Sequence, residues 1–137
     1  DPQNRVTTNQ LITEIQQDSR LISAQYSIKP AKTLSNNKSR EAGYKILNTD
    51  IDFNLMAIED ADIYKFIHTL SYGFPGQIII KNFSILKERD VTQPLLRKIG
   101  VGQAEALVKA TLNVSWRTMV PDENLSVPQQ NNQSGGR

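Results

Sequence analysis

Few side chains in this sequence have the chemistry of a catalytic or metal-binding group. His68 is the only histidine, and the sequence contains no cysteine. The lack of cysteine excludes disulfides, thiolate nucleophiles and thiolate metal sites. Because a metal site needs several converging ligands, we predict that the isolated His68 is a surface or half-buried structural residue.

Carboxylates are the next candidates, and several of them lie between residues 50 and 62. Asp50 and Asp52 are two positions apart in a strand-like segment, so they share one face of it. Glu59, Asp60 and Asp62 follow at the start of a helix-like segment. Paired carboxylates can act as acid and base or bind a hard cation. No loop of calcium-binding spacing surrounds them, which favours a solvated strand face and an acidic helix start.

Phosphate-binding and nucleophile motifs are absent from the sequence. The glycines at 73, 76, 100 and 102 do not form a loop that runs from a strand into a helix with a following Lys-Ser or Lys-Thr. No serine occupies the turn of a nucleophile elbow. We therefore predict no enzymatic activity, no cofactor and no bound metal.

The charge balance argues against a nucleic-acid partner. Sixteen basic and fourteen acidic residues give a net charge of +2, whereas nucleic-acid binding favours a concentrated basic stripe. Exposed aromatic residues on a sheet can stack on RNA bases. Phe53 shares its face with Ile51 and Leu55, which favours the core, and Phe83 between Lys81 and Ile85 fits either place.

The elements that must position these residues occur in one order twice. A helix-like segment and two strand-like segments span Asn9 to Leu55, and the same order spans Asp60 to Thr118. This αββαββ order is that of a ferredoxin-like βαββαβ sandwich whose first strand has moved to the end. We therefore predict a circularly permuted α+β sandwich, with a four-stranded antiparallel sheet and two helices on one face.

In the first half, apolar residues at helical spacing predict an amphipathic helix from Asn9 to Ala24: Leu11, Ile12, Ile15 and Ile22. Residues 26–30 fit a short edge strand that Pro30 frays. Residues 34–43 fit a hydrophilic loop. Apolar and polar residues then alternate from Leu47 to Leu55, which predicts an antiparallel strand with one wet face.

In the second half, an apolar stripe predicts a helix that begins near Asp60: Ile63, Phe66, Ile67 and Leu70. Gly73 is expected to end it in the left-handed conformation. The run Ile78–Ile80 predicts burial on both faces, hence a central position for a strand over residues 77–86. A charged connection over residues 87–102 contains a helical turn around Leu95. The last strand, Leu107 to Thr118, alternates throughout.

The length of 137 residues suits one domain with a modest core. We expect a flexible lead-in at residues 1–8, the domain at 9–120 and a disordered tail rich in Gln, Asn, Ser and Gly at 121–137. No apolar run approaches the roughly 18 residues that a membrane span needs. Since the chain begins at Asp1 rather than Met, we expect a processed or truncated piece of a longer protein.

Two surfaces are candidates for self-association. The first is the helix stripe, represented by Leu11, Ile15 and Ile22. The second is the polar face of the last strand, with its edge if that strand lies at an edge of the sheet: Lys109, Thr111, Asn113 and Ser115. Plain exposure to solvent is an equally open interpretation of the polar face.

The chain resembles the PilO-like proteins of type IV pilus machines over residues 10–119. The resemblance rests on the runs Tyr64–Ile67 and Phe74–Ile85, in which an apolar helix, a Pro-containing turn and a strand follow one another. The GspM-like subunits of type II secretion share this layout. The longer connection over residues 87–102 and the Gln/Asn-rich tail depart from the common pattern.

The resemblance implies a structural scaffold without catalytic residues. It also implies a bitopic inner-membrane protein, of which this would be the periplasmic domain, downstream of a membrane span and a coiled coil. The implied partners are a second copy, in a homodimer, and a PilN-like paralogue. The alternative from another class is a small ferredoxin-like ligand-binding or sensor domain, which would need polar groups converging on an apolar pocket.

Overall fold

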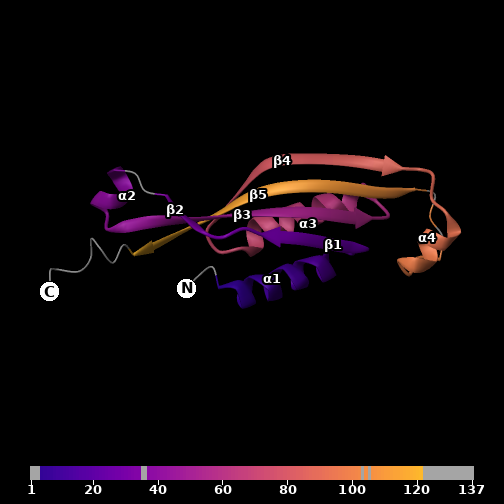
Figure 1. Ribbon diagram of the computed structural model, residues 1–137, viewed down its shortest axis with the longest axis horizontal. Coiled ribbons are helices and arrows are strands. Elements are labelled where there is room, and N and C mark those ends of the chain that lie inside the picture. Colours follow the sequence, from indigo (N-terminus) through magenta and orange to yellow (C-terminus); the bar gives the residue numbers. More distant parts are fainter. Residues whose placement is uncertain (1–3, 35–36, 103, 105, 122–137) are drawn as a thin grey trace.

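A computed structural model describes residues 4–34, 37–102, 104 and 106–121, which form an elongated α+β fold on one antiparallel sheet (Figure 1). In chain order the elements are α1 (Arg5–Asp18), β1 (Ser23–Ile28), β2 (Lys32–Leu34), α2 (Asn37–Glu41), β3 (Tyr44–Ala57), α3 (Asp60–Gly73), β4 (Gln77–Glu88), α4 (Gln93–Lys98) and β5 (Leu107–Pro121). No helix within these residues is long and apolar enough to cross a membrane.

The strand order in the sheet is β1-β3-β5-β4, and every neighbouring pair is antiparallel. The described sheet has five strands rather than the four predicted, because β2 also pairs with β3, beyond the end of β1. Pro30 lies between β1 and β2 and has no N–H to donate, so the two short strands replace one continuous strand along this edge.

Alternation along the two central strands separates a buried face from a polar face, as predicted. Phe53 of β3 lies opposite Leu112 of β5, and both are buried. The next pair, Asp52 and Asn113, lies on the other face. Because β3 and β5 pair over fourteen positions, this two-faced pattern extends along most of the sheet.

The helices α1 and α3 both cover the apolar face, which confirms that two helices lie on one side of the sheet. Ile12 of α1 and Phe66 of α3 are fully buried in the same cluster as the apolar side chains of β3 and β5. The ring of Phe66 contacts the ring of Phe53 edge-on at a centroid distance of 5.4 Å. Asp60 and Asp62 lie in the first turn of α3, where the helix dipole favours negative charge.

The first helix begins earlier than predicted, at Arg5, so residues 5–8 are not a flexible lead-in. Asn4 caps it, because its side-chain oxygen accepts the N–H groups of Val6 at 3.0 Å and Thr7 at 3.2 Å. Thr8 is buried, and its hydroxyl donates to the carbonyl of Asn4. A polar residue on the buried face concealed the helical period at this end.

The first helix also ends earlier, at Asp18 rather than near Ala24. The next residue, Ser19, is buried and its hydroxyl donates to the carbonyl oxygen of Ile15 at 2.7 Å. Arg20 then adopts a left-handed backbone conformation with φ of 61°, which turns the chain toward β1.

Gly73 does not adopt the left-handed conformation that we predicted, and Gly76 does, with φ of 86°. A Cβ atom on Gly73 would lie 3.4 Å from Cδ1 of Ile15, an ordinary van der Waals distance, so α3 lies close to α1 at this residue. A Cβ on Gly76 would lie 2.3 Å from the carbonyl oxygen of Arg117, so the turn before β4 passes very close to β5.

The prediction that the strand after Gly76 is central is wrong. β4 lies at the edge of the sheet, and β5 lies in the centre between β3 and β4. The loop at 34–43 contains the short helix α2, and α4 confirms the helical turn around Leu95. The predicted tail lies outside the described residues except for Pro121, which ends β5.

Candidate functional site

The face of the sheet opposite the helices is the candidate site, and we call it the uncovered face. The structure places all four polar residues that we predicted on the last strand there: Lys109, Thr111, Asn113 and Ser115. Across the strand pair they meet Asp50 and Asp52 of β3, with Ser115 opposite Asp50 and Asn113 opposite Asp52. The two halves of the chain thus bring two polar rows together.

Asp50 is held by hydrogen bonds from both central strands. Its Oδ1 accepts the hydroxyl of Ser115 at 2.7 Å and the amide of Asn48 at 3.2 Å. Asn48 in turn accepts Nε of Arg117 at 3.0 Å. The hydrogen bond from Ser115 is the main cause that lowers the pKa of Asp50, with help from Asn48 and Lys81 and against the opposing effect of burial.

Asp52 is bound in the same manner one step along the strand. Its Oδ1 accepts the amide of Asn113, and its Oδ2 lies 3.4 Å from Nζ of Lys29. The amide oxygen of Asn113 accepts Nδ2 of Asn82 at 3.3 Å, which extends the network to β4. Both carboxylates are therefore engaged by neighbouring side chains, as expected of a structural strand face.

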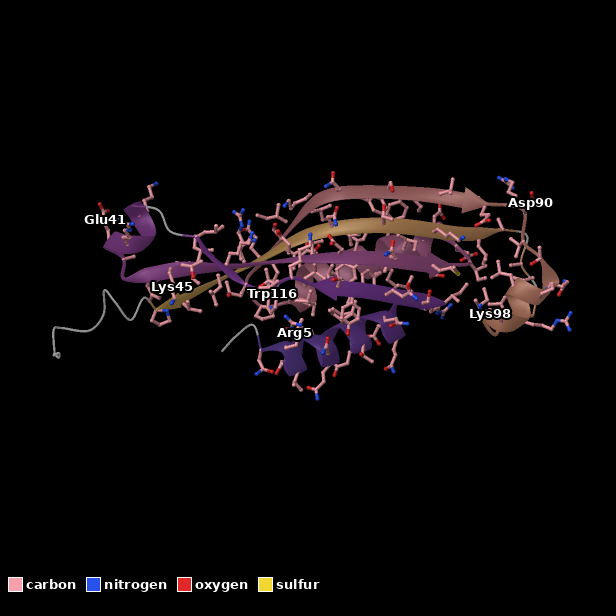
Figure 2. All side chains as sticks on the ribbon, viewed as in Figure 1. Arg5, Glu41, Lys45, Asp90, Lys98 and Trp116 are labelled. Carbon is pink, nitrogen blue, oxygen red and sulfur yellow. The ribbon has the colours of Figure 1, made fainter. Side chains whose placement is uncertain are left out.

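The network continues toward the far end of the sheet. The hydroxyls of Ser84 and Thr111 are 2.6 Å apart, and Nζ of Lys109 lies 2.7 Å from a carboxylate oxygen of Glu88. Figure 2 shows Asp90 and Lys98 at this end of the elongated molecule and Glu41 and Lys45 at the other. Polar contacts thus join β3, β5 and β4 along the uncovered face.

A shallow groove of about 370 Å³ crosses the uncovered face near that end. Residues from β1, β3, β4 and β5 line it: Ser23, Gln25, Asn54, Leu55, Met56, Ser84, Leu86, Lys109, Ala110 and Thr111. Its lining combines polar side chains with the apolar Leu55, Met56, Leu86 and Ala110, a combination that the sequence did not reveal because it draws on four strands.

The apolar stripe that we predicted as an interface packs inside the protein instead of facing a partner. Ile15 is only 3% exposed and belongs to the core cluster, and Leu11 packs against that cluster. Ile22 is half-buried beyond the end of α1, and its N–H donates to the carbonyl of Met56. The stripe therefore packs against the protein's own sheet.

The edge that we considered on the last strand does not exist, because β5 pairs with β3 on one side and β4 on the other. One outer edge of the described sheet instead belongs to β4, and the other belongs to β1 and β2. Three apolar side chains of β4 are exposed: Ile80, Ile85 and Leu86. The three consecutive isoleucines suggested burial, and the irregularity between Ile80 and Asn82 that changes the pairing has no signature in the sequence.

The remaining candidate residues from the sequence are His68, Phe53 and Phe83. His68 is exposed on α3, with its ring 4.7 Å from that of Tyr72. Phe53 is in the core, and the half-buried Phe83 contacts Tyr64 edge-on at 5.9 Å. Within the described residues, no three side chains of His, Cys, Asp or Glu gather closely enough to hold a metal ion.

Comparison of the chain with protein-family models, with curated proteins and with solved structures gave no match.

Proposed function

We propose that this domain is a structural scaffold that acts by self-association and by binding a PilN-like partner in a type IV pilus or type II secretion assembly. The interaction role rests on a contrast between the uncovered face of the sheet and the edge formed by β4. The carboxylates of the uncovered face bind neighbouring side chains, whereas apolar side chains and a strand edge are exposed along β4. Such surfaces suit recognition of another protein.

The fold arrangement supports the more specific part of the proposal. In a ferredoxin-like sheet the first and third strands of the chain lie at the centre. If the first strand moves to the end of the chain, the second and the last strands are central. With β1 and β2 counted as one interrupted strand, β3 and β5 have these positions. The inner-membrane anchor and periplasmic location follow from the resemblance alone.

Analytical ultracentrifugation of the purified chain over a wide concentration range tests self-association. We expect reversible dimers whose fraction rises with concentration. A purified PilN-like periplasmic domain from the same source organism, added at equal molar ratio, should form a faster-sedimenting complex. A species that stays monomeric alone and with this partner would reject the scaffold role.

The second candidate function is a ligand-binding or sensor domain, and the groove on the uncovered face favours it. Its volume of about 370 Å³ falls in the range of small-molecule sites, and its lining combines polar and apolar side chains. A fragment screen by NMR distinguishes the two functions. Saturable shifts confined to Asn54, Ser84 and Thr111 would support a ligand site, and the scaffold proposal expects none.

A further inference from the structure

A second pocket lies on the sheet at the end opposite the groove. β3 pairs with β5 as far as Pro121, but β4 first pairs with β5 at Arg117, opposite Gln77. Beyond Arg117, β5 therefore has a described neighbour on one side only, and a pocket of about 430 Å³ lies at this step. We call it the Arg117 pocket, and its lining residues are Ile46, Gly76, Gln77, Arg117, Thr118 and Met119.

A chain of hydrogen bonds holds the side chain of Arg117. Its Nε donates to Oδ1 of Asn48 at 3.0 Å, and Nδ2 of Asn48 donates to Oδ1 of Asp50 at 3.2 Å. Asp50 in turn accepts the hydroxyl of Ser115. Because this chain uses only Nε of the guanidinium, the two Nη atoms remain as the parallel pair of donors that a carboxylate accepts in a bidentate manner.

Arg117 forms no ion pair with a carboxylate of the described residues. The ion pairs of the uncovered face join other side chains: Lys29 with Asp52, Lys81 with Asp50, and Lys109 with Glu88. Lys32 of β2 lies opposite Asn48 on the side away from Arg117, and it also forms no ion pair within this part of the chain. Positive charge without a counter-charge favours an anionic ligand at this end of the sheet.

The next row across the sheet is apolar. Met119 of β5, Ile46 of β3 and Leu34 of β2 lie opposite one another on the uncovered face. Met119 is 62% exposed, and Ile46 is half-buried. Since neighbouring rows on one face of a strand are roughly 7 Å apart, a ligand of that length can contact the guanidinium at one end and the apolar row at the other.

We propose that the Arg117 pocket binds a small carboxylic acid with an apolar chain. The Nη atoms of Arg117 donate to the carboxylate, and Ile46 and Met119 cover the apolar chain. The volume of about 430 Å³ falls in the range of small-molecule sites. A carboxylate monoanion suits this pocket better than a phosphate dianion, because one guanidinium supplies a single charge and one pair of parallel donors.

This inference goes beyond the scaffold role and does not depend on it. NMR titration of the chain with isocaproate tests the pocket. We expect saturable shifts of the Ile46, Gln77 and Met119 amides, with a Kd on the order of 1 mM because the ligand is small. Isocaproamide keeps the shape without the charge, and acetate keeps the charge without the chain. Each should bind at least roughly tenfold more weakly than isocaproate.

Two substitutions test the two parts of the pocket separately. Arg117→Gln removes the charge and should weaken isocaproate binding at least roughly tenfold. Met119→Ser leaves the hydrogen bond from Arg117 to Asn48 in place and should weaken isocaproate binding about fivefold, without changing that of acetate. Lys109→Gln is the matched control, since it removes a positive charge from the same strand and face, and it should bind isocaproate like the parent.

Other carboxylates of the same chain are a competing occupant. Asp122 and Glu123 follow β5 directly in the sequence. A variant with both Asp122→Asn and Glu123→Gln should bind isocaproate like the parent. A tenfold gain in affinity would show that these carboxylates compete for the pocket, and it would overturn the proposal.

The remaining outcomes also decide the question. Weakened isocaproate binding in Arg117→Gln but not in Lys109→Gln supports the pocket. Equal binding of isocaproamide and isocaproate overturns the proposal, and so does inorganic phosphate that binds as tightly as isocaproate. Circular dichroism shows whether the variants fold. If Arg117→Gln does not fold, Met119→Ser decides, because an unchanged affinity for isocaproate in that variant overturns the proposal.

Discussion

At the scale of single residues, the polar face of the sheet behaves as one connected structure. Asp50 and Asp52 looked like possible acid and base groups because of their spacing. In the fold each accepts a hydrogen bond from the opposing strand, from Ser115 and Asn113 respectively. Their oxygens thereby fix the register of β3 against β5, since a slip by one residue would remove both bonds.

Because the pKa of Asp50 is lowered in the folded chain, the stability of the fold depends on pH. The unfolded chain has a pKa near the ordinary 3.8, and the folded chain has a lower one. The ionised group therefore stabilises the fold at pH values above the unfolded pKa. This contribution is lost as the pH falls through the folded pKa.

We predict that Ser115→Ala raises the pKa of Asp50 toward 3.8, because the Ser115 hydroxyl is the largest cause of the lowering. The measurement is an NMR titration of the Asp50 carboxyl carbon between acid and neutral pH. Ser84→Ala is the control, since the hydroxyl of Ser84 pairs with Thr111 instead. Equal titration midpoints in Ser115→Ala and in the parent would contradict the assignment.

At the scale of elements, the sequence predicted those segments whose local pattern and tertiary role agree. The stripe of Ile63, Phe66 and Leu70 predicted α3, and strict alternation predicted β3 and β5, because one face of each is buried. The start of α1 was missed because Thr8 is polar and buried. Ile22 fits the apolar spacing of the helix although it lies after the end of α1. The prediction therefore extended the helix into the turn that follows it.

The position of a strand within the sheet could not be predicted from its own residues. Ile78–Ile80 suggested a central strand, yet Ile80 is exposed at the edge and the amphipathic 107–121 segment is central. Pairing partners depend on how α3 and the 89–106 connection return the chain to the sheet. The polar network was likewise hidden, because Asp50 and Ser115 are 65 positions apart.

The turn between α3 and β4 is the element most sensitive to a small change. We predict that Gly76→Ala destabilises the fold more than Gly43→Ala does. Both glycines have positive φ, so each variant carries about 1–2 kcal/mol of backbone strain. Only at residue 76 would the new Cβ also meet a backbone carbonyl, that of Arg117, at 2.3 Å.

Urea unfolding followed by the fluorescence of Trp116, the only tryptophan, measures both variants. Trp116 is buried and donates to the carbonyl of Pro75 in the same turn, so its emission reports on this region. Equal losses of unfolding free energy at the two sites would show that the turn moves away from Arg117 at no cost.

At the scale of the whole molecule, the described sheet has two central strands, β3 and β5, and an outer strand position on each side. β5 pairs along both edges, with β3 and with β4, while β4 pairs only with β5 within the described residues. The helices cover one face of this arrangement, and the other is polar. Stability should therefore be greatest along β3 and β5 and should decline toward both outer strands.

Amide hydrogen exchange in dilute protein tests this gradient. We predict that amides in the middle of β5, such as that of Val114, exchange slowest and that half of the β4 amides, those directed outward, exchange rapidly. Uniform protection across β4 and β5 in dilute solution would contradict the enclosed position of β5.

The central position of β5 has a further consequence for biosynthesis. β5 is the last strand of the described chain, and β4 meets the sheet only through it. A nascent chain that has reached residue 106 has made β1, β3 and α3 but cannot yet attach β4. The isoleucines of β4 thus lack their β5 neighbours until β5 leaves the ribosome. We expect the sheet to be completed only after β5 is translated, and until then the exposed apolar residues of β4 are open to binding by chaperones.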